Sequence, residues 1–255
     1  LNGEDLNSRP DCSASRWVID FNDRTEAAAR EYELPMARVE QDVRPERVKN
    51  VRAARRDLWW RFAENAAGMR KAIANLGQVL VIAQTSNTLM CVRQGCGQIL
   101  SHMLVVFATS SYADQAVLSS SVHQLWIVQR GSGLRGDPRY IPSDVFATFP
   151  RPIHGEGLDL VGRELDEQRR EIMVRRQLGL TKLYNLVNDP DLPDSADADV
   201  ARMRQIHVDL DLAVMAAYGW DDVPLDHGFH TYRQMTRWTV SPAARVEILD
   251  RLLEE

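Results

Sequence analysis

The sequence lacks any long apolar run. Within its 255 residues, no stretch approaches the roughly 18 consecutive apolar residues of a membrane-spanning helix. The first residues, LNGEDLNSRPD, have neither the basic start nor the apolar core of a secretory signal peptide. We therefore expect a cytoplasmic protein without a membrane partner.

Cysteine is also scarce. The chain has only Cys12, Cys91 and Cys96, an odd number that argues against a disulfide framework and agrees with a reducing compartment. Cys91, Cys96 and His102 form a weak metal-ligand set, because strand residues alternate faces and buried cysteines are usually small core residues.

Several catalytic signatures are missing. The sequence contains no glycine-rich dinucleotide motif after a strand, no phosphate-binding loop ending in Gly-Lys-Ser/Thr, and no Gly-x-Ser-x-Gly nucleophile elbow. These common enzyme classes therefore find no support in the chain.

The charge that is present is unevenly distributed. The net charge is −5, but residues 43–152 hold 14 basic against 6 acidic side chains, whereas residues 153–255 hold 12 against 20. A basic half joined to an acidic half suggests that one segment meets a polyanion and the other does not. Charges that merely solvate the surface are the alternative explanation.

Hydrophobic periodicity predicts an α+β fold with two domains. Apolar runs predict strands and 3.6-residue spacing predicts helices up to residue 150, after which the pattern is helical only. The predicted elements are strands at 16–21, 78–84, 89–94 and 102–109, and helices at 24–34, 45–66, 112–129, 157–177, 181–189, 200–217 and 241–255. We expect a domain at 1–152 with a small mixed sheet and packed helices, and an all-helical domain at 153–255.

Two clusters carry candidate chemistry. The string RAARRDLWW sets Arg52, Arg55 and Arg56 on one predicted helix, and such a row suits phosphate oxygens or guanine edges unless it pairs with neighbours such as Asp57. The string DDVPLDHGFH offers oxygen and nitrogen ligands for a metal, although carboxylates near a helix end are more often caps. Its members are Asp221, Asp222, Asp226, His227 and His230, with His207 and Asp211 as further candidates.

Many longer strings resemble the carboxy-terminal part of Type IIG adenine-specific DNA methyltransferases, single-chain restriction and modification enzymes with relatives in phage defence. They span nearly the whole chain: LNGEDLNSRP, SRWVIDFND, VRPERV, RRDLWWRF, LSSSVHQLWIVQRGSGL, DPRYIPSDVFATFPRP, ELDEQRREIM, GLTKLYNLVNDP, IHVDLDLAVMAAYGWDD and LDHGFH. The resemblance implies that residues 1–152 form a target-recognition domain for double-stranded DNA, which the segment at 135–150 closes. It implies that residues 153–255 brace the methyltransferase domain of the same polypeptide.

The resemblance also implies what the chain leaves to other parts of such an enzyme. Family members methylate N6 of adenine with S-adenosylmethionine, using a glycine-containing motif and an Asn-Pro-Pro-Tyr/Phe motif for the flipped base. Neither motif occurs here. We therefore expect the chain to be a non-catalytic fragment that begins after the catalytic domain, with no cofactor of its own.

Twelve residues are the predicted DNA contacts. Four arginines, Arg52, Arg55, Arg56 and Arg61, are expected on phosphate. Polar loop residues are expected on phosphate or base edges: Thr85, Ser86, Asn87, Arg93, Arg130, Ser132, Arg135 and Arg139. Two rival functions remain, a metal-dependent hydrolase built on the Asp/His cluster and a protein-interaction module that uses the acidic helices.

Overall fold

A computed structural model describes residues 1–134, 137–153, 157–232 and 235–255. The chain forms two compact units, a smaller one at Arg16–Ala74 and a larger one made of Leu1–Ser15 with Asn75–Glu255. The boundary predicted near residue 152 lies inside the larger unit. The reason is that helices from the acidic half pack directly against the sheet-bearing half.

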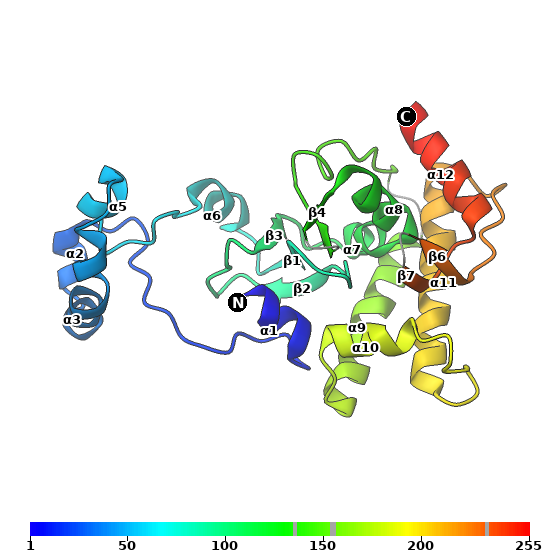
Figure 1. The fold of residues 1–255 in the computed structure, drawn as a ribbon, viewed down its shortest axis with the longest axis horizontal. Coiled ribbons are helices and arrows are strands. Elements are labelled where there is room, and N and C mark those ends of the chain that lie inside the picture. Colours follow the sequence, from blue (N-terminus) through cyan, green and yellow to red (C-terminus); the bar gives the residue numbers. More distant parts are fainter. Residues whose placement is uncertain (135–136, 154–156, 233–234) are drawn as a thin grey trace. The chain divides into compact units, whose positions relative to one another are not determined.

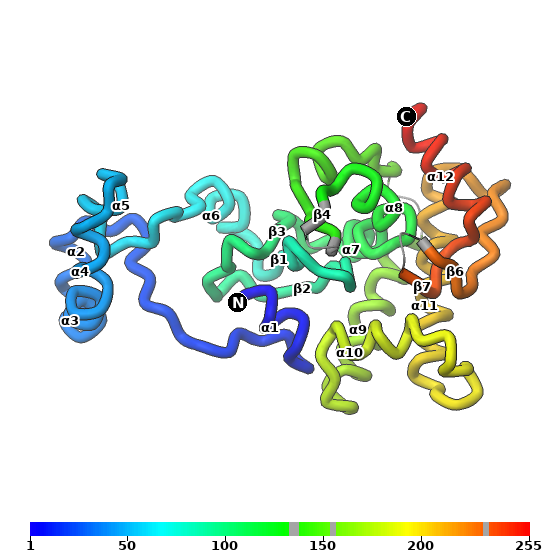
Figure 2. Tube along the Cα trace, in the orientation of Figure 1, coloured from blue at the N-terminus to red at the C-terminus, as the bar shows by residue number. Residues whose placement is uncertain are grey.

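The smaller unit consists of short helices (Figure 2), and its core contains two adjacent tryptophans. Its helices are α2 (Glu26–Arg30), α3 (Glu33–Asp42), α4 (Arg44–Arg47), α5 (Ala53–Asp57) and α6 (Ala67–Ile73). Trp59 and Trp60 are both buried, next to Phe21 and Met36.

Two sequence predictions in this unit are wrong. The predicted helix at 45–66 is broken. Asn50 closes a turn onto the Arg52 N–H, and the next helical segment ends before Leu58, whose backbone is not helical. Residues 16–21 form no strand: Asp20 caps a turn at Asn22, and Trp17 is fully exposed.

The larger unit is built on a three-stranded antiparallel sheet in the order β2-β1-β3 (Figure 1). The central strand β1 (Gln78–Ala83) is an apolar run buried on both faces, and it pairs with β2 (Val92–Gly95) and β3 (Leu104–Phe107). The α+β prediction is confirmed, although both ladders of this sheet are antiparallel rather than mixed. Leu89, with a φ of 50°, delays the second strand to Val92.

Serine caps split the predicted helix at 112–129 into two. Helix α7 (Tyr112–Ser119) is capped by Ser111, and α8 (Ser121–Arg130) is capped by Ser120, whose hydroxyl accepts from the His123 N–H. The side chain of a serine competes with helical backbone bonding and favours such breaks. The split gives α8 its own direction along the sheet-bearing half.

The acidic half is mainly helical, as predicted, and packs onto α7 and α8. Helix α9 (Leu158–Arg176) lies against both α7 and α11 (Ala198–Tyr218), and α12 (Pro242–Glu254) contacts α8 (Figure 1). Helix α10 (Leu180–Val187) contacts α1 (Gly3–Ser8) and α11. This half also holds a hairpin that the sequence pattern did not predict, β6 (Gly228–Tyr232) paired with β7 (Met235–Thr239).

Candidate nucleic-acid interface

One edge of the larger unit brings together a turn and a hairpin that are far apart in sequence. The short hairpin of β4 (Ser132–Leu134) and β5 (Asp137–Arg139) meets the turn at 85–88. Thr85 bridges to Arg139, the Ser86 N–H donates to the carbonyl of Pro138 at 3.4 Å, and the Tyr140 N–H donates to the carbonyl of Gln84 at 2.7 Å. The backbone thus holds the two predicted contact loops side by side.

The alternation of extended backbone separates exposed from buried side chains on this hairpin. Arg139 is exposed, and its side chain has no hydrogen bond or ion pair to any residue that the structure describes. The next residue, Tyr140, is fully buried and shares a 3.1 Å hydrogen bond with His123. Opposite Arg139 in the register is Ser132, which is also exposed.

Arg130 adds a second exposed guanidinium beside the hairpin. It ends α8, two residues before Ser132, and its guanidinium carbon lies 4.7 Å from the centre of the Trp126 ring. Stacking on an aromatic face orients an arginine while leaving its N–H groups free for an anion. The predicted contact at Arg135 lies outside the described residues.

The turn residues differ in what they expose. Asn87 is exposed, Thr85 is half-buried, and the side chain of Ser86 is turned inward, where its hydroxyl accepts from the Thr88 N–H at 3.1 Å. Ser86 therefore shapes the turn, and in this conformation it does not present its hydroxyl to a ligand.

Phe149 closes the segment at 135–150 in the core, as predicted. Its ring centre lies 4.9 Å from that of His123 and 6.3 Å from that of Trp126. Phe146 is only half-buried, with its ring centre 5.1 Å from that of Phe107 and with Arg151 above it. This packed end holds the loop that precedes it.

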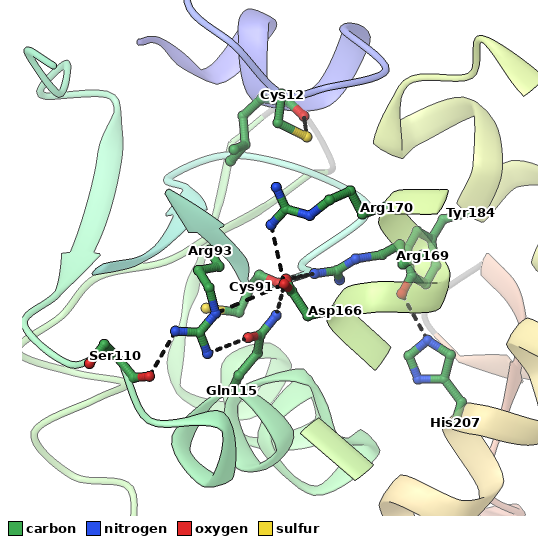
Figure 3. A network of polar contacts seen from close by, with 11 residues as sticks. Cys12, Cys91, Arg93, Ser110, Gln115, Asp166, Arg169, Arg170, Tyr184 and His207 are labelled. Atoms are coloured by element: carbon green, nitrogen blue, oxygen red, sulfur yellow. Dashed lines mark hydrogen bonds and ion pairs between the residues drawn. The ribbon is translucent and has the colours of Figure 1, made fainter. Parts of the chain in front are cut away.

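The prediction that Arg93 meets DNA is wrong for this fold. Arg93 is 3% exposed, and it donates to the carbonyl of Ser110 at 2.7 Å and to the Gln115 side chain at 2.9 Å (Figure 3). Its guanidinium lies 3.9 Å from Asp166, a residue of α9. Neutralisation by a carboxylate from the acidic half explains why a strand arginine is buried.

Asp166 is the centre of a network of polar contacts in the larger unit (Figure 3). Asp166 accepts from Gln115 and Arg170, while Arg169 donates to the carbonyl of Cys91 at 2.8 Å. Burial raises the pKa of the Cys91 thiol to about 12, so this cysteine is a neutral, unreactive core residue. The network thus ties the sheet to α9 and offers no nucleophile.

The four arginines predicted to contact phosphate lie in the smaller unit, and three of them interact with neighbouring residues. Arg56 pairs with Asp57 at 2.9 Å, Arg55 approaches Glu64 at 3.8 Å, and Arg61 donates to the carbonyl of Arg24. Arg52 is exposed at the start of α5. The helix break therefore scatters the predicted arginine row instead of aligning it.

Residues of the Asp/His cluster form hydrogen bonds and ion pairs within the protein. His227 donates to Asp211 at 2.8 Å, Asp222 binds Arg251, and His230 donates to the carbonyl of Asp226. Within the part of the chain that the structure describes, no group of three or more His, Cys, Asp and Glu residues could hold a metal ion. These contacts favour a structural role for the cluster.

Arg237 on β7 is the residue at this edge that the sequence analysis missed. Its guanidinium donates to the main-chain oxygen of Asn87, so the β6–β7 hairpin joins the same edge as the β4–β5 hairpin. The alternating pattern GFHTY and MTRWT could have indicated the two strands. The contact with Asn87, however, is a product of tertiary packing.

A shallow cleft of about 260 Å³ lies elsewhere, in the smaller unit, lined by Val18, Ile19, Asp20, Phe21, Arg24, Tyr32 and Pro35. Asp20 there is paired with Arg70 at 2.8 Å, and the Arg24 guanidinium lies over the Tyr32 ring. The cleft is mainly apolar and offers no set of free catalytic groups. Among the helices of the described residues, none is long and apolar enough to cross a membrane.

Comparison with known proteins finds a structural likeness without a sequence family. No family model matches the chain, and no curated protein matches its sequence. A solved structure described as the Type IIL restriction-modification enzyme MmeI in complex with DNA matches 100% of this chain, with a TM-score of 0.66 and 19% sequence identity. The chain spans only 30% of that protein. It therefore has the fold of one segment of a restriction-modification enzyme.

Proposed function

We propose that this chain is the target-recognition region of a restriction-modification DNA methyltransferase and that it reads a sequence in double-stranded DNA. The observation that carries the proposal is the fold likeness along the whole chain to a segment of an enzyme solved with DNA. The exposed edge supports it, because Arg130 and Arg139 offer donors that suit phosphates and base edges.

The architecture of the edge suits recognition. Arg139 projects from a strand whose next residue, Tyr140, is locked in the core, so the guanidinium is presented from a rigid base. The backbone at Arg139 therefore loses little conformational entropy on binding. It can bind guanine through two hydrogen bonds or a phosphate through one or two.

The chemistry of the parent enzyme belongs to the same proposal. We infer that a methyltransferase domain of the same polypeptide transfers a methyl group from S-adenosylmethionine to N6 of adenine. The apolar cleft of the smaller unit, with Trp17 and Leu34 exposed around that unit, is a surface on which such a domain could pack. The acidic helices α9 to α12 brace the edge rather than touch DNA.

Binding to a randomised duplex pool tests the proposal. The 255-residue chain should enrich one sequence from the pool, and its binding should weaken steeply as salt rises. Arg139→Ala should leave the melting temperature nearly unchanged. If Arg139 reads a base, the substitution should cost about 1–3 kcal/mol of discrimination at one base pair. If Arg139 contacts a phosphate, the substitution should instead reduce the dependence of log binding constant on log salt concentration by about one unit.

Arg175→Ala is the matched control, because it removes an exposed arginine from α9 in the acidic half. It should leave DNA binding unchanged. If Arg139→Ala and Arg130→Ala bind every duplex as the original chain does, this edge is not the recognition surface.

A further inference from the structure

Contacts with Arg204 and Asn188 hold the aromatic residues of the β6–β7 hairpin in place. Arg204, buried in α11, lies over the rings of Phe229 and Trp238 at 4.8 and 5.4 Å. The same guanidinium donates to Asp194 at 2.6 Å and to main-chain oxygens at the end of α10 and in the loop that follows it. The main-chain N–H of Trp238 donates to the side-chain oxygen of Asn188 at 3.0 Å. The hairpin base is therefore held in one orientation.

Two threonines of the hairpin are exposed. Thr231 and Thr236 face each other across the two strands, are both exposed, and share a 3.0 Å hydrogen bond between their hydroxyls. They follow Phe229 and Trp238 on the same face, so that face changes from half-buried aromatic rings to exposed hydroxyls along its length. Contact residues supported by packed neighbours are typical of binding sites.

The hairpin adjoins the candidate interface through Arg237. Its bond to the main-chain oxygen of Asn87 connects β7 to the turn at 85–88, and that turn is bridged to Arg139 on its other side. Burial lowers the pKa of Arg237, which is consistent with a positioning role within the protein. Two hairpins thus flank one turn.

Charge distinguishes the hairpin from the rest of the acidic half. Residues 153–255 carry 20 acidic side chains, yet residues 227–246 carry none. A surface that meets a polyanion avoids carboxylates, because each one would repel phosphate at close range. The gap coincides with the hairpin and the start of α12.

We propose that the β6–β7 hairpin is a second DNA-contacting element, with Thr231 and Thr236 lying against the duplex. A two-stranded ribbon fits the major groove, and threonine can donate to phosphate oxygens or place its methyl group against that of thymine. This inference rests on the proposed DNA-reading function, and it extends the interface into the half that carries the acidic charge.

Opposite charges placed at one surface position test the inference. Thr236→Lys should tighten binding of the 255-residue chain to a mixed-sequence 30-base-pair duplex at low salt severalfold, and Thr236→Glu should weaken it about tenfold. The slope of log binding constant against log salt concentration should become steeper by about one unit in Thr236→Lys and shallower by about one unit in Thr236→Glu. Because both substitutions replace one exposed threonine, their melting temperatures should agree. The matched pair Ala216→Lys and Ala216→Glu, on an exposed position of α11, should change binding little.

Each outcome decides between the proposals. If the chain binds DNA and Arg139→Ala weakens binding while the Thr236 pair behaves like the Ala216 pair, the hairpin inference is wrong and the recognition function stands. If the unaltered chain shows no salt-dependent duplex binding, both are wrong. Should Thr236→Glu fold poorly, Thr231→Lys and Thr236→Lys decide by whether they tighten binding.

Discussion

At the scale of single residues, two neighbours in sequence lie in opposite environments. Arg139 is exposed and Tyr140 is fully buried, so a substitution at one should affect ligands and at the other the fold. Phe149 belongs with Tyr140, because its ring contacts His123 and Trp126 in the same core. The segment that displays Arg139 is therefore anchored by aromatic residues beyond it.

Phe149→Ala should unfold the larger unit at lower denaturant concentration. Removing a buried phenylalanine costs about 3–5 kcal/mol, since the lost contacts leave a cavity. Phe146→Ala, at a half-buried ring, is the comparison and should cost clearly less. Urea unfolding of the two variants measures the difference, and equal losses would show that the packed end does not depend on Phe149.

Two buried histidines should make the protein less stable in mild acid. Burial lowers the pKa of both His123 and His207 to about 4, from about 6.5 when unfolded. The unfolded chain therefore binds more protons as the pH falls below about 6.5, and the free energy of unfolding falls with it. Between pH 7 and pH 5 each histidine should account for a loss of about 2 kcal/mol.

Urea titrations at several pH values measure this loss. In His207→Gln about half of the pH dependence should disappear. The hydrogen bonds agree with neutral rings: His123 donates from Nδ1 to the carbonyl of Leu118, so its Nε2 accepts from Tyr140. A stability that stays constant from pH 7 to pH 5 would contradict the assignment.

At the scale of elements, the contact between α7 and α9 joins the two halves of the chain. Gly162 allows it, because a Cβ at this position would lie 2.0 Å from the carbonyl oxygen of Tyr112 and 2.8 Å from its carbonyl carbon. Both atoms belong to the main chain of α7, which cannot move aside as the end of a flexible side chain can. Together with the buried pairing of Arg93 and Asp166, this close approach explains why α9 belongs to the sheet-bearing unit.

Gly162→Ala should therefore separate α7 from α9 and destabilise the larger unit by about 3 kcal/mol, the upper range for overpacking. Gly97→Ala, in the same unit, adds a Cβ with nothing within 4 Å and should be nearly neutral. Thermal unfolding followed by circular dichroism compares them. A Gly162→Ala protein as stable as the Gly97→Ala protein would mean that the helices pack more loosely than described.

At the scale of the whole molecule, the proposed role is recognition without chemistry. We expect the 255-residue chain not to bind S-adenosylmethionine, because neither the glycine-containing motif nor the Asn-Pro-Pro-Tyr/Phe motif occurs in it. Isothermal titration calorimetry with the cofactor measures this directly. Saturable micromolar binding, about −8 kcal/mol, would place part of the cofactor site within this chain.

The sequence by itself determined the elements whose signals are local. Apolar runs located the three strands of the sheet, helical spacing located α9 and α11, and serine followed by proline marked the start of α12. Local signals suffice there because hydrophobic periodicity and capping act over a few residues. The packed position of Phe149 and the exposure of Arg139 could likewise be predicted.

Only the tertiary structure decided which polar residues remain available to a ligand. Arg93 and Arg139 are both strand arginines in the basic half. Asp166, 73 positions away, lies 3.9 Å from the Arg93 guanidinium, whereas no carboxylate of the described residues pairs with Arg139. Trp59 and Trp60 pack in a core with Phe21, a contact that the helical pattern at 45–66 did not predict. Arg237 lies at the candidate interface because its guanidinium donates to the main-chain oxygen of Asn87. Such pairings depend on distances between segments remote in sequence, which residue spacing along the chain does not encode.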